Sequence, residues 1–338
     1  MSLSEEYNVS QRSPVLFDIS NEYGRLFAHG RDTIDLLHRM STNDLKPLET
    51  TNNISALTAL TNEKGRIVDV LRIVRDGFGK TLVITGHDKE QAVIQWLDKF
   101  TIMEDARFEA ATEKIAQYFI GGPEADSVIS KYANINAASN SHVYGVNIAG
   151  QNATLFKGSS VASYGWSILT LQQSAEMVWN ELRREVLAIS GVVGDRELYE
   201  VLRIEQGIPI VPNELNEKHN PLETPLAAQT VSFTKGCYIG QEVIARLDAQ
   251  DKVQRKLVGL KFLGEPPHVG DRIATQEPTN NPLGDEIGDV TSVVNSPAHG
   301  IIGLGYVRGK YAVAGTIVSI RPSEGSATVV HLPFTANK

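Results

Sequence analysis

The sequence predicts an α+β protein with a small all-β barrel or sandwich at its carboxyl end, and three observations support this fold class. Helical and strand patterns alternate up to about residue 250, without an internal repeat or a low-complexity tract. After residue 255, short strand patterns punctuated by glycine and proline follow one another. Hydrophobic residues make up 41% of the 338 residues, which is ordinary for a globular chain of two or three domains.

Three stretches of the body have the spacing of amphipathic helices. They cover residues 32–40, 88–100 and 174–189. In the second stretch, Asp88 is expected to cap the helix and Gln91 to return the capping-box contact. The apolar stripes of the second and third helices should face the core. These stripes are Val93, Trp96, Leu97 and Phe100, and then Val178, Leu182, Val186 and Ile189.

Strand patterns separate these helices and then dominate the end of the chain. In the body they cover residues 55–60, 66–74 and 81–85. At the carboxyl end they cover residues 258–262, 287–294, 300–306 and 316–321. The polar stretch 248–256 is the expected domain boundary, which divides the chain into a body of residues 1–250 and a barrel of residues 251–338.

Composition and charge exclude several classes of protein. No apolar run approaches the roughly 20 residues of a membrane span, and the first residues, with Glu5 and Glu6, do not resemble a signal peptide. The single cysteine excludes an internal disulfide and an all-cysteine metal site, which favours the reducing cytoplasm. The net charge of −8 gives no general attraction to phosphate backbones. We therefore expect a soluble, cytoplasmic protein without a membrane partner, a direct nucleic-acid partner or a bound metal.

Two carboxylates fall where the pattern is otherwise apolar. Asp69 interrupts the hydrophobic face of a predicted strand, and Glu205 continues the buried stripe of a predicted helix. Glu205 lies just before that helix ends at Gly207, where a negative charge opposes the helix dipole at a cost of up to about 1 kcal/mol. Each acid therefore needs a partner. The partner is either a structural base such as Arg203 or Arg246, or a ligand with two adjacent N–H donors.

The only cysteine, Cys237, lies in the segment FTKGCYIGQEVI, residues 233–244. Lys235 is a nearby cation, Gly236 and Gly240 allow a ligand to approach the backbone, and a helix is expected to start just downstream. These conditions lower the pKa of a thiol below its usual value of about 8.5. The segment therefore predicts a reactive thiol, although a lone cysteine is more often an inert small hydrophobe.

Five segments share the motifs of one family. They are STND (41–44), NEKGRIVD (62–69), LRIEQGIP (202–209), PLE (221–223) and KGCYIGQE (235–242). In these segments the chain resembles the folate-binding relatives of the glycine-cleavage T-protein, and among them the YgfZ branch, which assists iron-sulfur proteins. The resemblance covers nearly the whole length. KGCYIGQE resembles the signature that separates the iron-sulfur branch from the glycine-cleavage enzymes.

The resemblance implies a ring of three domains around a central hole that binds tetrahydrofolate, with the predicted barrel as the third domain. Glu205 would match the acid that holds the pterin, whose 2-amino group and N3–H are two adjacent donors. Asp69 would match the first of two consecutive acids of the enzymes, and it is a candidate catalytic residue together with Cys237. The second acid position is Val70 here. This departure weakens the case for an aminomethyltransferase.

The remaining candidates have alternative interpretations. Lys235 either contacts the glutamate tail of the folate or covers the surface, and Tyr238 either packs against the ring edge of the folate or belongs to the core. Asn43 and Asp44 either line the folate cavity or form a polar turn that ends a helix. His219 is expected to be solvated.

What the resemblance implies for function is a tetrahydrofolate-binding protein that supports assembly or repair of iron-sulfur clusters in client enzymes, and through them affects tRNA modification. Folate and the iron-sulfur clients would be its partners, and a monomer is expected. Cys237 would act as a nucleophile, a redox group or a cluster ligand. The alternative is a folate-dependent aminomethyltransferase. A third possibility is a folate-binding scaffold whose thiol is incidental.

Overall fold

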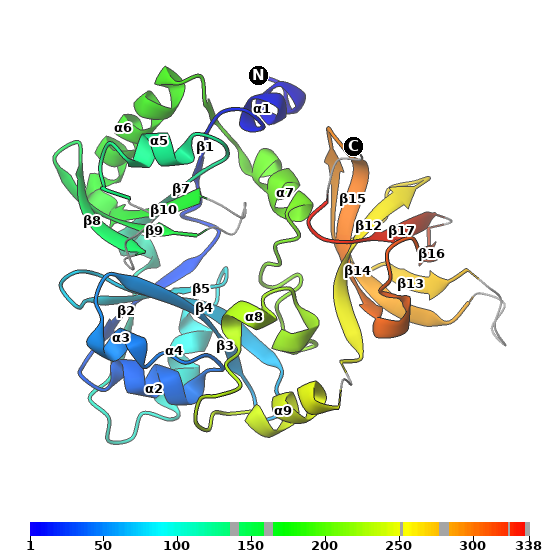
Figure 1. Cartoon of the computed structure of the whole chain (residues 1–338), viewed down its shortest axis with the longest axis horizontal. Coiled ribbons are helices and arrows are strands. Elements are labelled where there is room, and N and C mark those ends of the chain that lie inside the picture. The colour runs from blue at the N-terminus through cyan, green and yellow to red at the C-terminus, as the bar shows by residue number, and fades with distance from the viewer. Residues whose placement is uncertain (136–141, 159–164, 251–252, 277–283, 324, 335–338) are drawn as a thin grey trace.

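The computed structural model describes residues 1–135, 142–158, 165–250, 253–276, 284–323 and 325–334. These residues form two sheets with helices against them, which we call the body, and a closed barrel at the carboxyl end (Figure 1). The predicted fold class, α+β with a C-terminal β-barrel, is therefore confirmed. Figure 1 shows the three parts around a common centre, with helix α7 (Arg196–Glu205) between the body and the barrel. No helix of the described residues is long and apolar enough to cross a membrane.

The first sheet has the strand order β11-β1-β7-β10-β9-β8, in which the pair of β1 and β11 is parallel. Helix α6 packs on it through Val178, Leu182 and Val186, which confirms the helix expected at 174–189. The strands are β1 (Val15–Asp18), β7 (Ile115–Gly121), β8 (Val143–Ile148), β9 (Gln151–Lys157), β10 (Gly165–Leu171) and β11 (Val192–Val193). The helices are α5 (Ala125–Ile129) and α6 (Ala175–Ala188).

The second sheet has the order β3-β4-β5-β2-β6 and is antiparallel throughout. The chain enters it after β1 and leaves it before β7, so the two halves of the body are interleaved. Its strands are β2 (Gly24–His29), β3 (Ile54–Thr61), β4 (Ile67–Arg75), β5 (Thr81–Thr85) and β6 (Arg107–Ala110). Its helices are α2 (Thr33–Met40), α3 (Pro47–Thr50) and α4 (Glu90–Asp98).

The start of α4 differs from the prediction. Its N-cap is Lys89, which makes no side-chain cap hydrogen bond, so the expected capping box of Asp88 and Gln91 is wrong. Asp88 adopts a left-handed backbone conformation with φ of 54°, which an aspartate tolerates better than most residues. Its carboxylate lies 3.2 Å from Nε2 of His87. The helix therefore begins at Glu90, two residues later than the start expected from the sequence pattern.

Helix α7 connects the body to the barrel. The Leu198 N–H donates to Oδ1 of Asp195 at 3.0 Å, which makes Asp195 the N-cap. Gly207, just past the other end, has φ of 70°, a conformation that glycine adopts readily. Ile204 packs against apolar side chains of the barrel. The other helices are α1 (Leu3–Ser10), α8 (Ala227–Thr230) and α9 (Gln241–Ala249).

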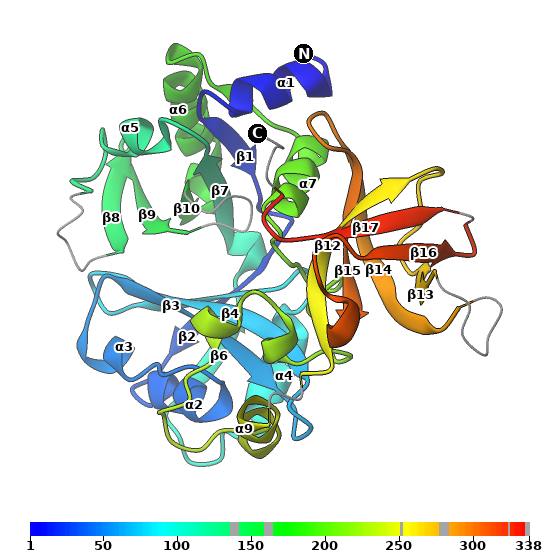
Figure 2. The ribbon, with the colours of Figure 1, turned by 45° about the vertical axis from the view of Figure 1, so that its right-hand side comes forward.

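The barrel closes in the order β12-β15-β14-β13-β16-β17. Figure 2 shows it beside α7, with β12 leading in from the body. The four strands expected from the sequence are present, and β13 and β17 are additional. The bounds are β12 (Arg255–Leu263), β13 (Arg272–Thr275), β14 (Glu286–Ser296), β15 (Gly300–Arg308), β16 (Ile317–Arg321) and β17 (Ser326–Val330).

Candidate functional site

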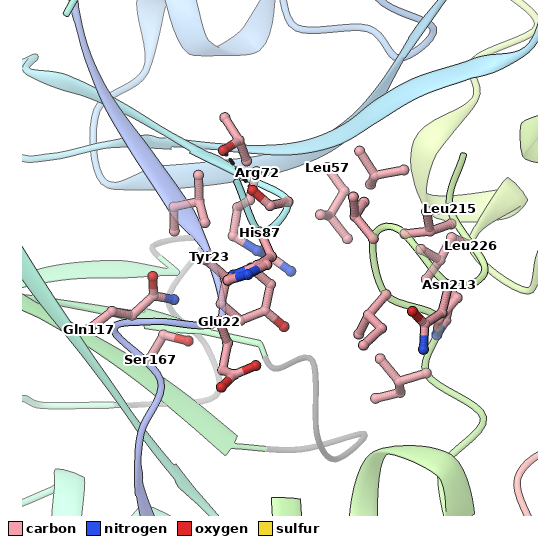
Figure 3. Close-up of a pocket in the computed structure, with 18 of the residues that line it drawn as sticks. Glu22, Tyr23, Leu57, Arg72, His87, Gln117, Ser167, Asn213, Leu215 and Leu226 are labelled. Atoms are coloured by element: carbon pink, nitrogen blue, oxygen red, sulfur yellow. Dashed lines mark hydrogen bonds between the residues drawn. The ribbon is translucent and has the colours of Figure 1, made fainter. Parts of the chain in front are cut away.

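A cavity of about 220 Å³ lies between the two sheets of the body, α7 and the segment that follows α7. Figure 3 shows Tyr23, Arg72 and His87 on one side of it, across from Asn213 and Leu215. The polar lining includes Glu22, Tyr23, Arg72, His87, Gln117, Ser167, Arg196, Glu200 and Asn213. The apolar lining includes Leu57, Val70, Ile84, Phe156, Val211 and Leu226. Small-molecule sites usually combine apolar walls with polar groups that fix the orientation of the ligand, and this cavity has both.

Glu200 is the carboxylate of α7 that lines this cavity. Its Oε2 accepts hydrogen bonds from Nε and Nη2 of Arg203, at 2.9 and 2.6 Å. Its Oε1 is buried and has no hydrogen-bond partner among the described residues. A buried carboxylate oxygen without a donor is costly. This atom can therefore accept an N–H from a ligand in the cavity.

Arg203 holds Glu200 in place and joins the cavity wall to the barrel. Its side chain is fully buried. Besides Glu200, its Nη2 donates to Oγ of Ser292 in β14 at 2.8 Å, and its Nη1 lies 3.6 Å from Oε2 of Glu214. Oγ of Ser292 in turn donates to Oε1 of Glu214 at 2.7 Å. One buried arginine thus orients two carboxylates and links three segments of the chain.

Two tyrosines connect the second sheet of the body with α7. The hydroxyl oxygens of Tyr23 and Tyr199 are 3.0 Å apart. Burial raises the pKa of Tyr23 to about 12, so its hydroxyl stays neutral and available as a hydrogen-bond donor. Glu22 and Arg196, which also line the cavity, form an ion pair with 3.3 Å between Oε1 and Nη1.

Asp69 lies behind the cavity wall. Its carboxylate is fully buried, as predicted, and both oxygens accept the Gly86 N–H, at 3.2 and 3.0 Å. Burial raises the pKa of Asp69 to about 7, against the opposite effect of the hydrogen bonds from Gly86 and Val70. Gly86 lines the cavity, and a Cβ there would lie 2.6 Å from Val211 and 2.9 Å from Oδ1 of Asp69. The Gly86 and Val70 N–H groups both donate to this carboxylate, and both residues line the cavity.

Glu205 is also buried, but its partners are hydroxyl groups. Oη of Tyr7 donates to its Oε2 at 3.0 Å, and Oγ of Ser296 donates to its Oε1 at 2.5 Å. Burial raises the pKa of Glu205 against the effect of these bonds. The structural bases considered for it, Arg203 and Arg246, are not its partners, and Glu205 does not line the cavity. Its role as the pterin anchor stays a prediction.

Lys235 is buried against the end of α2. Its Nζ donates to the carbonyl oxygens of His38, Ser41 and Asn43, with distances of 2.6 Å to Ser41 and 2.9 Å to Asn43. A cation there satisfies carbonyls that a helix end leaves unpaired. Burial lowers the pKa of Lys235 to about 8. All three N–H donors are used within the fold, which leaves none for a folate tail.

Tyr238, Asn43 and Asp44 also lie outside the cavity lining. Tyr238 belongs to a small apolar core, in line with the core interpretation. Nδ2 of Asn43 donates to the carbonyl oxygens of Leu57 and Gln229, at 2.7 and 2.9 Å. Oδ1 of Asp44 accepts a backbone N–H two residues along the chain at 3.0 Å. These contacts are typical of a polar turn that follows a helix.

Cys237 is exposed in the segment between α8 and α9. It is not part of the cavity lining. Within the described residues there is no group of three or more His, Cys, Asp or Glu side chains that could hold a metal ion. Because Cys237 is exposed, a second macromolecule can reach its thiol from outside the body.

The expectation that His219 is solvated is wrong. Its side chain is buried, and its Nδ1 lies 2.9 Å from Oε2 of Glu223. Its ring stacks on Tyr306 of β15, with 3.4 Å between the ring centroids. The local sequence is polar, and the barrel, which comes much later in the chain, buries it.

Sequence reasoning missed Glu200 and Arg72. Glu200 forms an i,i+3 pair with Arg203, a spacing that is typical of an exposed helix face. Arg72 follows Val70 on the other face of β4 from Asp69. One arginine among the apolar residues of that face was a weak signal for a polar group at the site. Its place in the cavity depends on the other sheet and on α7, which lie elsewhere in the chain.

Comparison with known proteins gives matches over nearly the whole chain. The family model for the GCVT N-terminal domain matches residues 1–235, and that for the glycine cleavage T-protein C-terminal barrel domain matches residues 255–335. A putative chloroplastic transferase of Arabidopsis thaliana is 27% identical over 331 residues, which are 96% of this chain and 72% of the relative. The aminomethyltransferase of Halalkalibacterium halodurans is 27% identical over 98% of this chain and 90% of its own.

A solved structure shows the same fold. The glycine cleavage system aminomethyltransferase T from Bartonella henselae superposes with a TM-score of 0.82 and 21% sequence identity. The alignment covers 100% of this chain and 90% of that chain.

Proposed function

This chain belongs to the glycine cleavage T-protein family of folate-binding domains, and from that membership we propose that it binds tetrahydrofolate and supports assembly or repair of iron-sulfur clusters in client enzymes. The proposed clients include enzymes that modify tRNA, and the proposed location is the cytoplasm. We propose that the protein acts as a monomer. The observation that carries the folate part is the unpartnered Oε1 of Glu200 in the cavity wall.

The cavity fits the pterin of a tetrahydrofolate in its chemistry. A pterin presents a 2-amino group and an adjacent ring N–H, and the Glu200 carboxylate supplies a buried acceptor of the kind such donors require. Arg203 holds this carboxylate by two hydrogen bonds, so it is ordered before a ligand arrives. Val70 and Phe156 supply apolar lining for the faces of a ring. Glu200, Val70 and Phe156 would bind and orient the ligand. A bound tetrahydrofolate would supply the chemistry of a one-carbon carrier.

Two features support the iron-sulfur role over aminomethyl transfer. Val70 lines the cavity, and the resemblance implies that the glycine-cleavage enzymes carry their second acid at this position, where this chain has an apolar group instead. The thiol of Cys237 is exposed on the outside of the body, where a client enzyme can reach it. The aminomethyltransferase names of several relatives favour the alternative function.

An assay for aminomethyl transfer to tetrahydrofolate separates the iron-sulfur role from the aminomethyltransferase role, and we expect no product above background.

Replacement of Glu200 by glutamine tests the folate site. We expect Glu200→Gln to weaken tetrahydrofolate binding at least about tenfold, because hydrogen bonds to a charged acceptor lose strength when the charge is removed. Anaerobic calorimetric titration measures the affinity. Glu205→Gln, from the same helix, tests the alternative anchor that the resemblance implies, and its affinity should equal that of the unchanged protein if the pterin is held by Glu200. The reverse pattern would assign the pterin to Glu205.

Replacement of Cys237 by serine tests the iron-sulfur role. Because the thiol lies outside the cavity lining, Cys237→Ser should bind tetrahydrofolate as the unchanged protein does. It should fail to restore the activity of iron-sulfur enzymes in cells that lack the protein. Thr234→Ala, in the same exposed segment, is the control and should restore that activity. Full restoration by Cys237→Ser would show that the thiol is dispensable and would favour the folate-binding scaffold.

A further inference from the structure

Arg72 is a cation in the cavity wall without a counter-charge. Its Nη1 donates to Oγ of Ser55 at 3.3 Å, and its guanidinium lies over the ring of Phe156, 5.5 Å from the centroid. An arginine has five N–H donors, and this is the only hydrogen bond of Arg72 to a described residue. Gly158 leaves room for the group, because a Cβ there would lie 3.0 Å from Nη2.

No carboxylate of the described residues pairs with this guanidinium. Glu22 is paired with Arg196, and Glu200 with Arg203. Burial lowers the pKa of Arg72 to about 10, and the only opposing contribution comes from Tyr23. The undescribed segments 136–141 and 159–164 contain neither aspartate nor glutamate, so they cannot supply the counter-charge. Arg72 is partly buried in the cavity lining, where a positive charge without a counter-charge favours an anionic ligand.

The negative and positive groups that could meet a ligand therefore lie on different elements of the cavity wall. Glu200, with its free oxygen, lies on α7, and Arg72 lies on β4 beside the tyrosine pair. We propose that Arg72 is an anion subsite of this cavity, and that it binds a carboxylate while the N–H donors of the pterin face Glu200. This inference rests on the proposed function, because it assigns a second subsite of the proposed folate site.

A carboxylate matches the subsite better than a phosphate. Arg72 offers a single positive charge and a planar fork of donors, which pairs with the planar carboxylate in a bidentate manner. A phosphate carries more charge and needs further cations or a helix N-terminus, and the cavity lining has no second unpaired Lys or Arg among the described residues. The carboxylate belongs either to the glutamate tail of a folate or to a separate small acid bound beside the pterin.

The test compares three forms of the full chain by anaerobic calorimetric titration: the unchanged protein, Arg72→Met and Arg75→Met. Arg75 is the matched control, because it lies on the same strand and its guanidinium donates to Asn52 and Thr81 outside the cavity lining. The probes are tetrahydrofolate, 6-methyltetrahydropterin without a carboxylate, and p-aminobenzoylglutamate. Glycine is titrated into the protein saturated with the methylpterin. Thermal unfolding of each ligand-free form is recorded alongside.

We expect the unchanged protein and Arg75→Met to bind tetrahydrofolate at least about tenfold more tightly than the methylpterin. Arg72→Met should lose this difference while keeping its affinity for the methylpterin and its thermal stability. If the difference is absent but glycine binds only when Arg72 is present, the subsite stands and its carboxylate belongs to a separate molecule.

Other outcomes overturn the subsite. It is excluded if no carboxylate probe depends on Arg72, or if Arg72→Met weakens every probe equally together with a loss of thermal stability. Failure of both pterins to bind any form would refute the folate function instead. In that case p-aminobenzoylglutamate and glycine decide the subsite by themselves, since Arg72-dependent binding supports it and its absence overturns it.

Discussion

Replacement of Arg203 by methionine is expected to lower the free energy of unfolding by about 3–5 kcal/mol, the range for breaking a buried ion pair from one side. Methionine fills a similar volume but removes the hydrogen bonds to Glu200 and Ser292. It also leaves Glu214, which is fully buried, without its nearby cation. Urea unfolding followed by circular dichroism measures the change.

Two further variants show whether the uncompensated charge is the cause. Arg196→Met removes an exposed arginine from the same helix, whose ion pair with Glu22 is a surface pair, and should cost less than about 1 kcal/mol. The double variant Arg203→Met with Glu214→Gln should recover part of the lost stability, because it removes a buried charge that has no partner. A double variant with the summed cost of both single changes would contradict this explanation.

The second large effect concerns Lys235. Lys235→Met should lower the free energy of unfolding by roughly 3 kcal/mol, because three carbonyl oxygens at the end of α2 lose their shared donor. The folded fraction of Lys235→Met should keep the affinity of the unchanged protein for tetrahydrofolate. Unfolding in urea and calorimetric titration of the same sample measure the two quantities.

Lys64→Met, an exposed lysine in a turn of the body, is the control for Lys235 and should change stability by less than about 0.5 kcal/mol. The opposite pair of results for Lys235→Met, with stability unchanged and folate affinity lost, would restore the interpretation in which Lys235 contacts the glutamate tail. Its three carbonyl contacts would then be incidental.

Arg203 also shows why the barrel matters for a cavity in the body. Its Nη2 donates to both Glu200 in the cavity wall and Ser292 in β14. Tyr306 of β15 donates from its hydroxyl to the carbonyl oxygen of Glu214 at 3.0 Å, which adds a second link between barrel and body. The orientation of the carboxylate proposed to bind the pterin therefore depends on a domain that does not line the cavity.

The spacing of residues predicted the elements well where one face of an element is apolar. The stripe of Val178, Leu182 and Val186 located α6, and the alternation around Asp69 located β4. The start of α4 was wrong because Asp88 can serve as a cap or adopt a left-handed turn, and the local pattern permits both. Local spacing therefore predicts an element better than it predicts the residue at which the element begins.

Local patterns in the chain were enough to predict the fold class, the family and the burial of Asp69 and Glu205, because periodicity and motifs are local properties. The partner of each buried group could not be predicted in this way, because it comes from a distant segment. Glu205 contacts Tyr7 and Ser296, which are 198 and 91 residues away in the chain, and it turns from the cavity that Glu200 lines. A helical stripe shows which side chains share a face. It does not show which distant segment will cover that face, because that depends on how the two sheets and the barrel pack together.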